Sequence, residues 1–101
     1  MYVAIRRLKI QPGFMDEAVR LVETELVPIL SSAPGFVEYD VVEVEEDVGL
    51  TISVFETKEQ AEESNRRAAE WVGPRLVPLA AGPFEIVAVG EVRVHKGRQA
   101  E

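Results

Sequence analysis

The stretch FVEYDVVEVEEDVGLTISVFE, residues 36–56, decides the fold. β-Branched and aromatic side chains fill residues 36–45 and again residues 50–56, a composition typical of strands. Residues 46–49 between them combine two acids with a glycine, as hairpin turns do. The stretch therefore predicts two antiparallel strands around which the rest of the chain must fold.

On the N-terminal side, residues 2–10 predict a further strand, because β-forming residues alternate there with Arg and Lys. A helix is predicted from Met15 to Ile29, where apolar residues recur every three or four positions and acids fill the other face. Pro28 is expected to end or kink this helix, and residues 31–35 form the next loop.

On the C-terminal side, Thr57 and Gln60 have the spacing of a capping box and start a second helix that runs to about Val72. Gly73-Pro74 is expected to end the regular helix and to begin a short irregular segment. Residues 84–95 form a long β-rich run and predict the last strand.

The predicted order is β-α-β-β-α-β. This order is typical of the α+β, ferredoxin-like fold, in which a four-stranded antiparallel sheet carries both helices on one face. At this length we expect one domain, residues 1–95, followed by a polar C-terminal tail, residues 96–101.

Composition excludes several classes of site. The absence of cysteine excludes disulfides, thiolate zinc sites, cysteine nucleophiles and cysteine-ligated iron–sulfur clusters. The charge of −7 argues against a nucleic-acid partner. The glycines fit neither a dinucleotide-binding loop nor a P-loop, and His95, the single histidine, excludes a two-histidine metal site within the chain. No leader or membrane-spanning stretch is apparent, so we expect a cytoplasmic protein with no membrane partner.

The second face of the predicted sheet is unusually apolar. In residues 36–45 and 84–95, apolar side chains occupy both parities, so neither face of these strands is polar. An open sheet with an apolar outer face predicts association, and a twofold homodimer is the commonest form. The alternative is a monomer with an ordinary share of exposed valines.

The second helix offers candidate pocket residues, because its predicted inward stripe is made of small side chains: Ala61, Asn65, Ala68 and Val72. Such a stripe leaves space between helix and sheet. Asn65 is then either a structural amide bonded to nearby backbone or a donor that lines a pocket. Trp71 is either core or a stacking platform, and its indole N–H needs a partner. Tyr39 offers a hydroxyl, although a strand tyrosine usually packs.

Arg6 and Arg7 are adjacent on a strand, so they point to opposite faces of the sheet. One of them must point toward the helices or the dimer interface, and an unpaired cation is costly in either place. A pocket anion or a substrate oxyanion would satisfy it. An ion pair would do the same, with the candidate partners Glu43, Glu56 and Glu91.

A resemblance to a known family rests on three features: the element order, Pro34-Gly35-Phe36 before the second strand, and Phe55-Glu56-Thr57-Lys58-Glu59 at the start of the second helix. Over about residues 1–95, the chain resembles the antibiotic biosynthesis monooxygenase-like domains of the dimeric α+β barrel superfamily. The resemblance implies a homodimer whose two sheets pack into a barrel, with one pocket in each subunit between sheet and helices.

Two enzyme groups of this family are relevant. In the cofactor-free oxygenases of polycyclic phenols, the deprotonated substrate itself reduces oxygen, and a few Asn, Trp, Tyr and Arg side chains line an apolar pocket. By this resemblance Asn65, Trp71 and Arg6 are the candidate catalytic residues, and no cofactor or metal is needed. The haem-degrading members need a strand asparagine and a helical histidine. Here Arg6 takes the strand position and no predicted helix has a histidine, so haem is not expected.

Two functions remain open from the sequence. The first is a cofactor-independent monooxygenase that acts on a small apolar or aromatic molecule. The second is a non-catalytic dimer, either a small-molecule-binding or a stress-associated protein, with the same fold.

Overall fold

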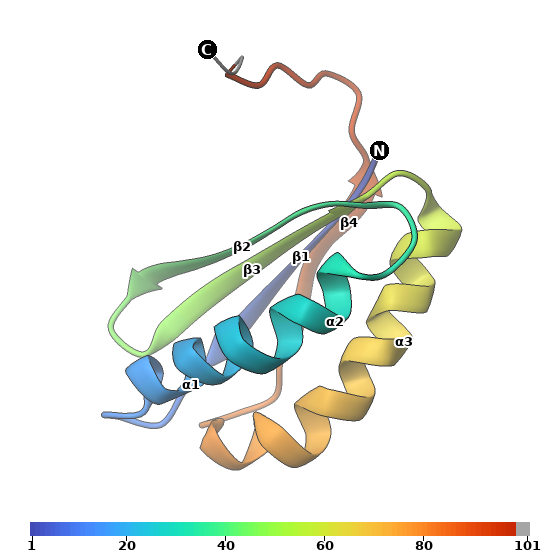
Figure 1. Ribbon diagram of the computed structural model, residues 1–101. Coiled ribbons are helices and arrows are strands. Elements are labelled where there is room, and N and C mark those ends of the chain that lie inside the picture. Colours follow the sequence, from blue (N-terminus) through green and yellow to red (C-terminus); the bar gives the residue numbers. More distant parts are fainter. Residues whose placement is uncertain (99–101) are drawn as a thin grey trace.

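The computed structural model describes residues 1–98 and has the predicted α+β, ferredoxin-like architecture (Figure 1). One antiparallel sheet has the strand order β2-β3-β1-β4. Its strands are β1 (Tyr2–Lys9), β2 (Phe36–Glu45), β3 (Val48–Phe55) and β4 (Glu85–Glu91). The helical elements are α1 (Met15–Leu21), the π-turn η1 (Val22–Leu26), α2 (Val27–Ser31), α3 (Lys58–Arg75) and the 3-10 turn η2 (Val77–Leu79).

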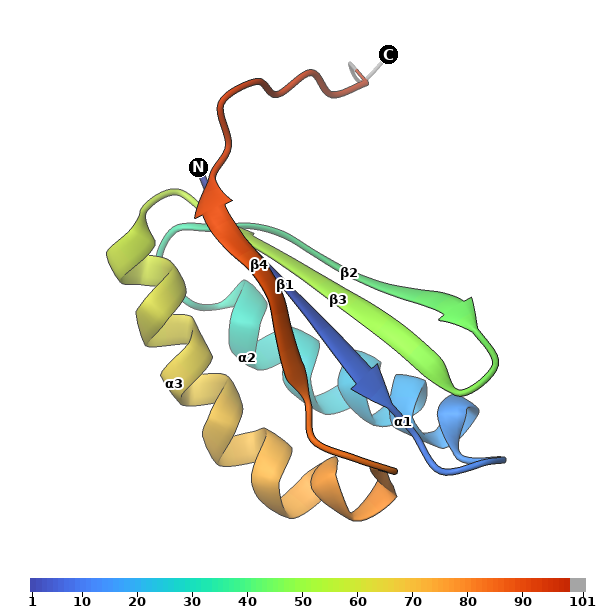
Figure 2. The same ribbon diagram turned by 180° about the vertical axis from the view of Figure 1, so that it is seen from behind.

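All helices lie on one face of the sheet. Figures 1 and 2 show α1, α2 and α3 against one side, while no element of residues 1–98 covers the other side. The larger core fills the space between the sheet and the helices, and it is built mainly of Leu, Ile and Val with Met15 and Trp71. Among the described residues, no helix has the length and apolar character needed to cross a membrane.

The sequence predicted that Pro28 ends or kinks the first helix. The helical segment does not end there but continues to Ser31, and an irregular turn interrupts it before the proline. The π-turn η1 comes directly before the proline, and the Val27 N–H donates to the Val22 carbonyl five residues back. Proline is accepted in the first turn of a helix, where its missing N–H is not needed, so the irregular turn lets α2 restart around it.

The β2–β3 hairpin is tighter than predicted. Only Glu46 and Asp47 form the turn, and β3 begins at Val48 rather than at Leu50. Asp47 takes the positive φ of 62° that the turn requires, a conformation that Asp tolerates better than most residues. Gly49 therefore lies within the strand, opposite Leu8 of β1.

The capping box predicted at the start of α3 is present. The Gln60 N–H donates to the Thr57 hydroxyl at 3.2 Å, and the Thr57 N–H donates to the Gln60 side chain at 3.2 Å. The predicted end near Val72 is wrong, because α3 continues through Pro74 to Arg75. Pro74 lies in the last turn, where only one intrahelical hydrogen bond is lost.

The last strand is shorter than the predicted residues 84–95. β4 ends at Glu91, whose partner is Tyr2, the first residue of β1. The Val92 N–H donates to the carbonyl of Met1, the residue before β1. Beyond this hydrogen bond β1 offers no pairing partner, so residues 92–98 extend away from the sheet. His95 is exposed, as expected. Of the predicted tail, residues 99–101 lie outside the described residues.

Two strand irregularities correct the predicted faces. Strict alternation puts Phe36 and Tyr39 on opposite sides of the sheet. A register shift between Phe36 and Glu38 instead pairs Phe36 with Phe55 and Tyr39 with Ser53, so both face the helices. A second shift, in the β1–β4 pairing, places Ile86 opposite Arg6 on the same side.

We expect Gly35→Ala to destabilise the protein more than Gly13→Ala. Both glycines have positive φ, so each alanine costs about 1–2 kcal/mol in backbone strain. A Cβ at Gly35 would also collide with the Gln60 side chain, whereas a Cβ at Gly13 meets nothing within 4 Å. The collision disturbs the capping box and adds about 1 kcal/mol. Thermal melts of the two variants measure the difference, and equal melting temperatures would contradict it.

Candidate functional site

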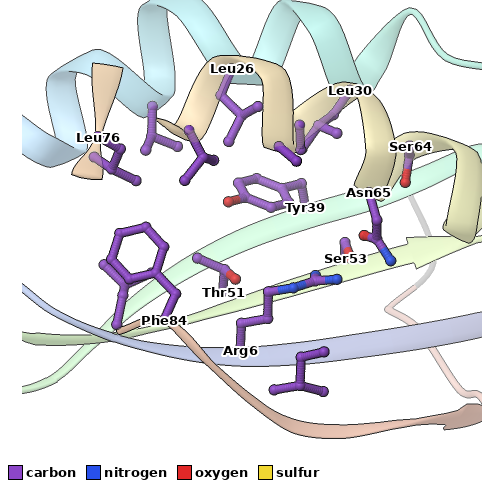
Figure 3. A pocket seen from close by; sticks show the side chains of 16 residues that line it. Arg6, Leu26, Leu30, Tyr39, Thr51, Ser53, Ser64, Asn65, Leu76 and Phe84 are labelled. Carbon is purple, nitrogen blue, oxygen red and sulfur yellow. The ribbon is translucent and has the colours of Figure 1, made fainter. Parts of the chain in front are cut away.

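A cavity of about 300 Å³ lies between the sheet and the helices (Figure 3). One wall comes from the first helical segment, through Val22, Leu26 and Leu30, and the opposite wall comes from α3. The sheet supplies the floor, and Phe84 and Ile86 close the side formed by β4. Most of the lining is apolar, so the cavity suits an apolar ligand.

The cavity exists because α3 presents small side chains toward the sheet, as the sequence predicted. Ser64, Asn65, Ala68 and Ala69 line it, together with Val72. A helix with Leu or Phe at these positions would fill the space. The first helical segment does so along the cavity, with the large aliphatic side chains of Val22, Leu26 and Leu30.

Polar groups gather on the floor. Arg6 of β1 lies opposite Thr51 of β3, and Ser53 of β3 lies opposite Tyr39 of β2. All four side chains line the cavity. Cross-strand partners share a face of the sheet, so strand register alone brings a cation, a phenol and two hydroxyls together.

Arg6 is the charged group of the site. It is half-buried, and burial holds the pKa of its guanidinium below the ordinary value, against a smaller opposing effect of Tyr39. Arginine nevertheless stays protonated in proteins. None of the three acids named as possible partners pairs with it. Within residues 1–98 Arg6 forms no ion pair, whereas Arg7, on the opposite face, lies 3.7 Å from Glu45.

Tyr39 supplies a neutral donor. Burial raises the pKa of its hydroxyl above the ordinary 10.0, while the neighbouring Thr51 hydroxyl and the Arg6 guanidinium act in the opposite direction. The phenol is therefore protonated at neutral pH and can donate a hydrogen bond inside the cavity.

Asn65 enters the cavity from the opposite side. Figure 3 shows its amide pointing from α3 down toward the Arg6 guanidinium. The residue is partly buried, and its side chain makes no hydrogen bond within residues 1–98. This geometry agrees with a group that lines a pocket rather than with a structural amide.

Trp71 is not brought together with Arg6 and Asn65. It is buried but lies outside the cavity lining, and its indole N–H donates to the Glu25 carboxylate at 3.0 Å. The structure therefore gathers two of the three predicted catalytic side chains in one cavity and places the third behind its wall.

Sequence reasoning missed Thr51 and Ser53 as polar lining residues and undervalued Tyr39. A signal was present in β3, where Thr51 and Ser53 share the inward face with the fully buried Phe55. Hydroxyls at inward positions of a central strand indicate polar requirements inside the fold. The position of Tyr39 depended on the bulge and could not be inferred from alternation.

No cluster of three or more His, Cys, Asp or Glu side chains that could hold a metal occurs within the described chain. The described lining of the cavity contains neither a carboxylate nor an imidazole. The site can therefore bind an apolar molecule that bears an oxyanion or hydroxyl, but it offers no strong general base of its own.

Comparison with protein-family models identifies a family. The family model described as antibiotic biosynthesis monooxygenase matches residues 1–69. No curated protein matches the sequence.

Solved structures share the fold at low identity. A protein of unknown function from Nitrosomonas europaea aligns with a TM-score of 0.82 and 14% identity, over 98% of this chain and 95% of that chain. A monooxygenase from Streptomyces coelicolor, in complex with nanaomycin D, has a TM-score of 0.76 and 16% identity over 97% and 92%. SnoaB, a cofactor-independent oxygenase from Streptomyces nogalater, has a TM-score of 0.75 and 13% identity over 93% and 94%.

We expect Asn65→Ala to leave stability nearly unchanged, because among residues 1–98 the amide has no partner that the substitution would strand. Removal of a structural amide would instead lower the free energy of unfolding by about 1–3 kcal/mol. Each kcal/mol corresponds to a drop of about 4–8 °C in melting temperature. Thermal melts at a fixed protein concentration distinguish the two. Leu21→Ala, a buried change outside the cavity, is the positive control and should cost about 2–5 kcal/mol. A drop of ten degrees for Asn65→Ala would assign the amide to the fold.

Proposed function

Since the chain belongs to the antibiotic biosynthesis monooxygenase family, we propose that it is a cofactor-independent monooxygenase of a small phenolic aromatic compound, acting as a homodimer. The observation that carries the proposal is Arg6, a half-buried cation that has no acidic partner among the described residues and lies on the floor of an apolar cavity. A bound phenolate would supply the missing negative charge.

Cavity size limits the substrate. The volume of about 300 Å³ lies at the lower end of the range of about 300–1,000 Å³ found for ligand pockets. Together with the aliphatic walls, this favours a flat aromatic molecule of two or three fused rings over a larger polyketide. The polar groups lie on the floor, so the hydroxyl of the substrate is expected to point toward β1 and β3.

The proposed role of Arg6 is to stabilise the phenolate. A desolvated guanidinium within contact distance lowers the pKa of a bound phenol, because it favours the charged form. Tyr39 donates a hydrogen bond to the same region. Asn65 has both donor and acceptor groups and orients the other end of the substrate or the incoming oxygen.

The chemistry then needs only the substrate and dioxygen. The phenolate transfers one electron to oxygen, and the resulting radical pair combines at a ring carbon to form a hydroperoxide. Loss of water gives a quinone. One oxygen atom enters the product in place of a ring hydrogen, the other leaves as water, and the substrate supplies all the electrons. For 1-naphthol the balance is one dioxygen consumed and one naphthoquinone and one water formed.

The absence of a carboxylate or imidazole in the described lining has a consequence for pH dependence. Deprotonation must rely on water and on the lowered pKa of the bound phenol. The activity should therefore rise with pH, and its midpoint should follow the pKa of the substrate across a series of phenols.

The two streptomycete structures support the proposal only through the shared fold. One is a monooxygenase in complex with nanaomycin D and the other is a cofactor-independent oxygenase. Identities of 16% and 13% carry the fold alone, so the argument for a phenolic substrate rests on the cavity.

We expect Arg6→Gln to lower kcat/KM for 1-naphthol by about 10²-fold, the usual effect of removing one oxyanion partner. Arg66→Gln is the control, because Arg66 is an exposed arginine of α3 that pairs with Glu63 and is not among the lining residues of the cavity. Oxygen uptake and quinone absorbance measure the rates. Binding without oxygen uptake in the wild type would favour the non-catalytic ligand-binding function, and equal rates in both variants would remove Arg6 from the mechanism.

The homodimer is supported by the uncovered face of the sheet. Ile5 of β1 pairs with Ile52 of β3, and Leu50 of β3 pairs with Val42 of β2, so aliphatic side chains meet in the middle of this face. Val42 is itself exposed and extends this aliphatic patch onto β2. A face of this kind is an expected association surface, and a second copy can cover it by sheet-on-sheet packing.

Sedimentation equilibrium at micromolar concentration should give twice the 11.2 kDa chain mass. Ile52→Asp places a charge in the middle of the proposed interface and should give monomers. Val77→Asp is the control, because Val77 is half-exposed on η2, outside the four strands. A monomeric wild type, or dimers of Ile52→Asp as stable as those of the wild type, would contradict this interface.

A further inference from the structure

One carboxylate joins the two helical walls of the cavity. Glu25 of η1 accepts hydrogen bonds from the Trp71 indole at 3.0 Å and from Arg75 Nε at 2.8 Å, and its second oxygen accepts from Arg75 Nη2 at 2.7 Å. Within residues 1–98, every side-chain hydrogen bond from α3 to another helix ends on Glu25.

The three residues lie directly behind the cavity wall. Each precedes a lining residue in the chain: Glu25 precedes Leu26, Trp71 precedes Val72, and Arg75 precedes Leu76. The contact therefore fixes the backbone of both walls at the residues that touch a ligand, although none of its own side chains lines the cavity.

The π-turn makes this arrangement possible. Val22, Leu26 and Leu30 recur at intervals of four residues and all line the cavity. Within the turn η1 (Val22–Leu26), Glu25 does not line the cavity but points toward α3, where it contacts Trp71. Such turns are often found at functional sites.

Electrostatics keeps the contact formed at neutral pH. Hydrogen bonds from Arg75 and Trp71 lower the pKa of Glu25 to about 2, with Arg20 of α1 acting in the same direction. Glu17 of α1 is the other charged group close to Arg75. A bidentate Arg–carboxylate pair has a defined geometry as well as a favourable energy, so it holds a distance and an angle.

We propose that Glu25, Trp71 and Arg75 form a latch that sets the separation of the two cavity walls, so that Glu25 is a positioning residue for ligand binding. The proposal rests on the proposed function only in taking the cavity as the site of a phenolic ligand. It gives Trp71, a candidate catalytic residue from the sequence, a role behind the wall.

The test compares Glu25→Ala with Glu23→Ala, since Glu23 is an exposed acid of the same turn that forms no ion pair within the described residues. The probe is 1-naphthol, and calorimetry measures its affinity. Amide hydrogen exchange over residues 64–72 measures the order of α3 without a ligand. We expect Glu25→Ala to weaken the affinity about tenfold and to speed exchange, and Glu23→Ala to change neither.

Further variants separate positioning from stability. Glu25→Gln keeps the acceptor oxygen and should recover part of the affinity. Trp71→Phe keeps the ring and removes only the N–H, so it provides a milder break if Glu25→Ala does not fold. In steady-state oxygen uptake, the latch variants should raise KM and leave kcat close to the wild-type value, because the latch does not touch the reacting atoms.

The outcomes distinguish the two proposals. Equal naphthol affinity in the wild type, Glu25→Ala and Trp71→Phe would overturn the latch, whatever the oxygen uptake. Faster exchange in α3 with unchanged affinity would overturn it too, because the contact would then serve stability alone. A wild type that binds naphthol through an intact latch but consumes no oxygen would overturn the monooxygenase and leave the latch. A wild type that does not bind naphthol would contradict both.

Discussion

The register of β1 between β3 and β4 is the constraint on which the site depends. It puts Arg6 opposite Thr51 on one side and opposite Ile86 on the other. A slip of one residue would turn Arg6 to the outer face and bring Arg7 under the helices. The apolar residues of β1 resist this slip, because Ala4 and Leu8 are buried on the same face as Arg6. The buried side chains of β1 thus fix the position of Arg6, although Arg6 itself contributes nothing to the core.

The cavity results from a difference between the two helical layers. The first helical segment fills its side of the core with leucine and valine, while α3 uses alanine, serine and asparagine where it passes over Arg6. Close packing normally removes such space, because a void forfeits dispersion contacts. A space that is kept open above a half-buried arginine is more easily explained by a ligand than by stability.

The carboxylate contact behind the wall compensates for this weak packing. A helix with small side chains has few apolar contacts to hold it against the sheet, so polar contacts at its C-terminal half carry more of its orientation. Glu25 makes three hydrogen bonds to α3 from an irregular turn of the opposite wall. Strand register, small side chains and one charged contact together define the volume available to a substrate.

Hydrophobic periodicity, the capping box and the hairpin determined the element order, the fold class and the small-residue stripe of α3, because each depends on neighbours within a few residues. They also placed Asn65 on the inward stripe of α3, but they did not decide which of Arg6 and Arg7 faces the helices. Tertiary structure decided the rest. The bulge turned Tyr39 inward, the π-turn carried the helix past Pro28, and Glu25 drew Trp71 away from the cavity. Bulges and long-range hydrogen bonds depend on partners up to 50 residues away, so local pattern alone could not reveal them.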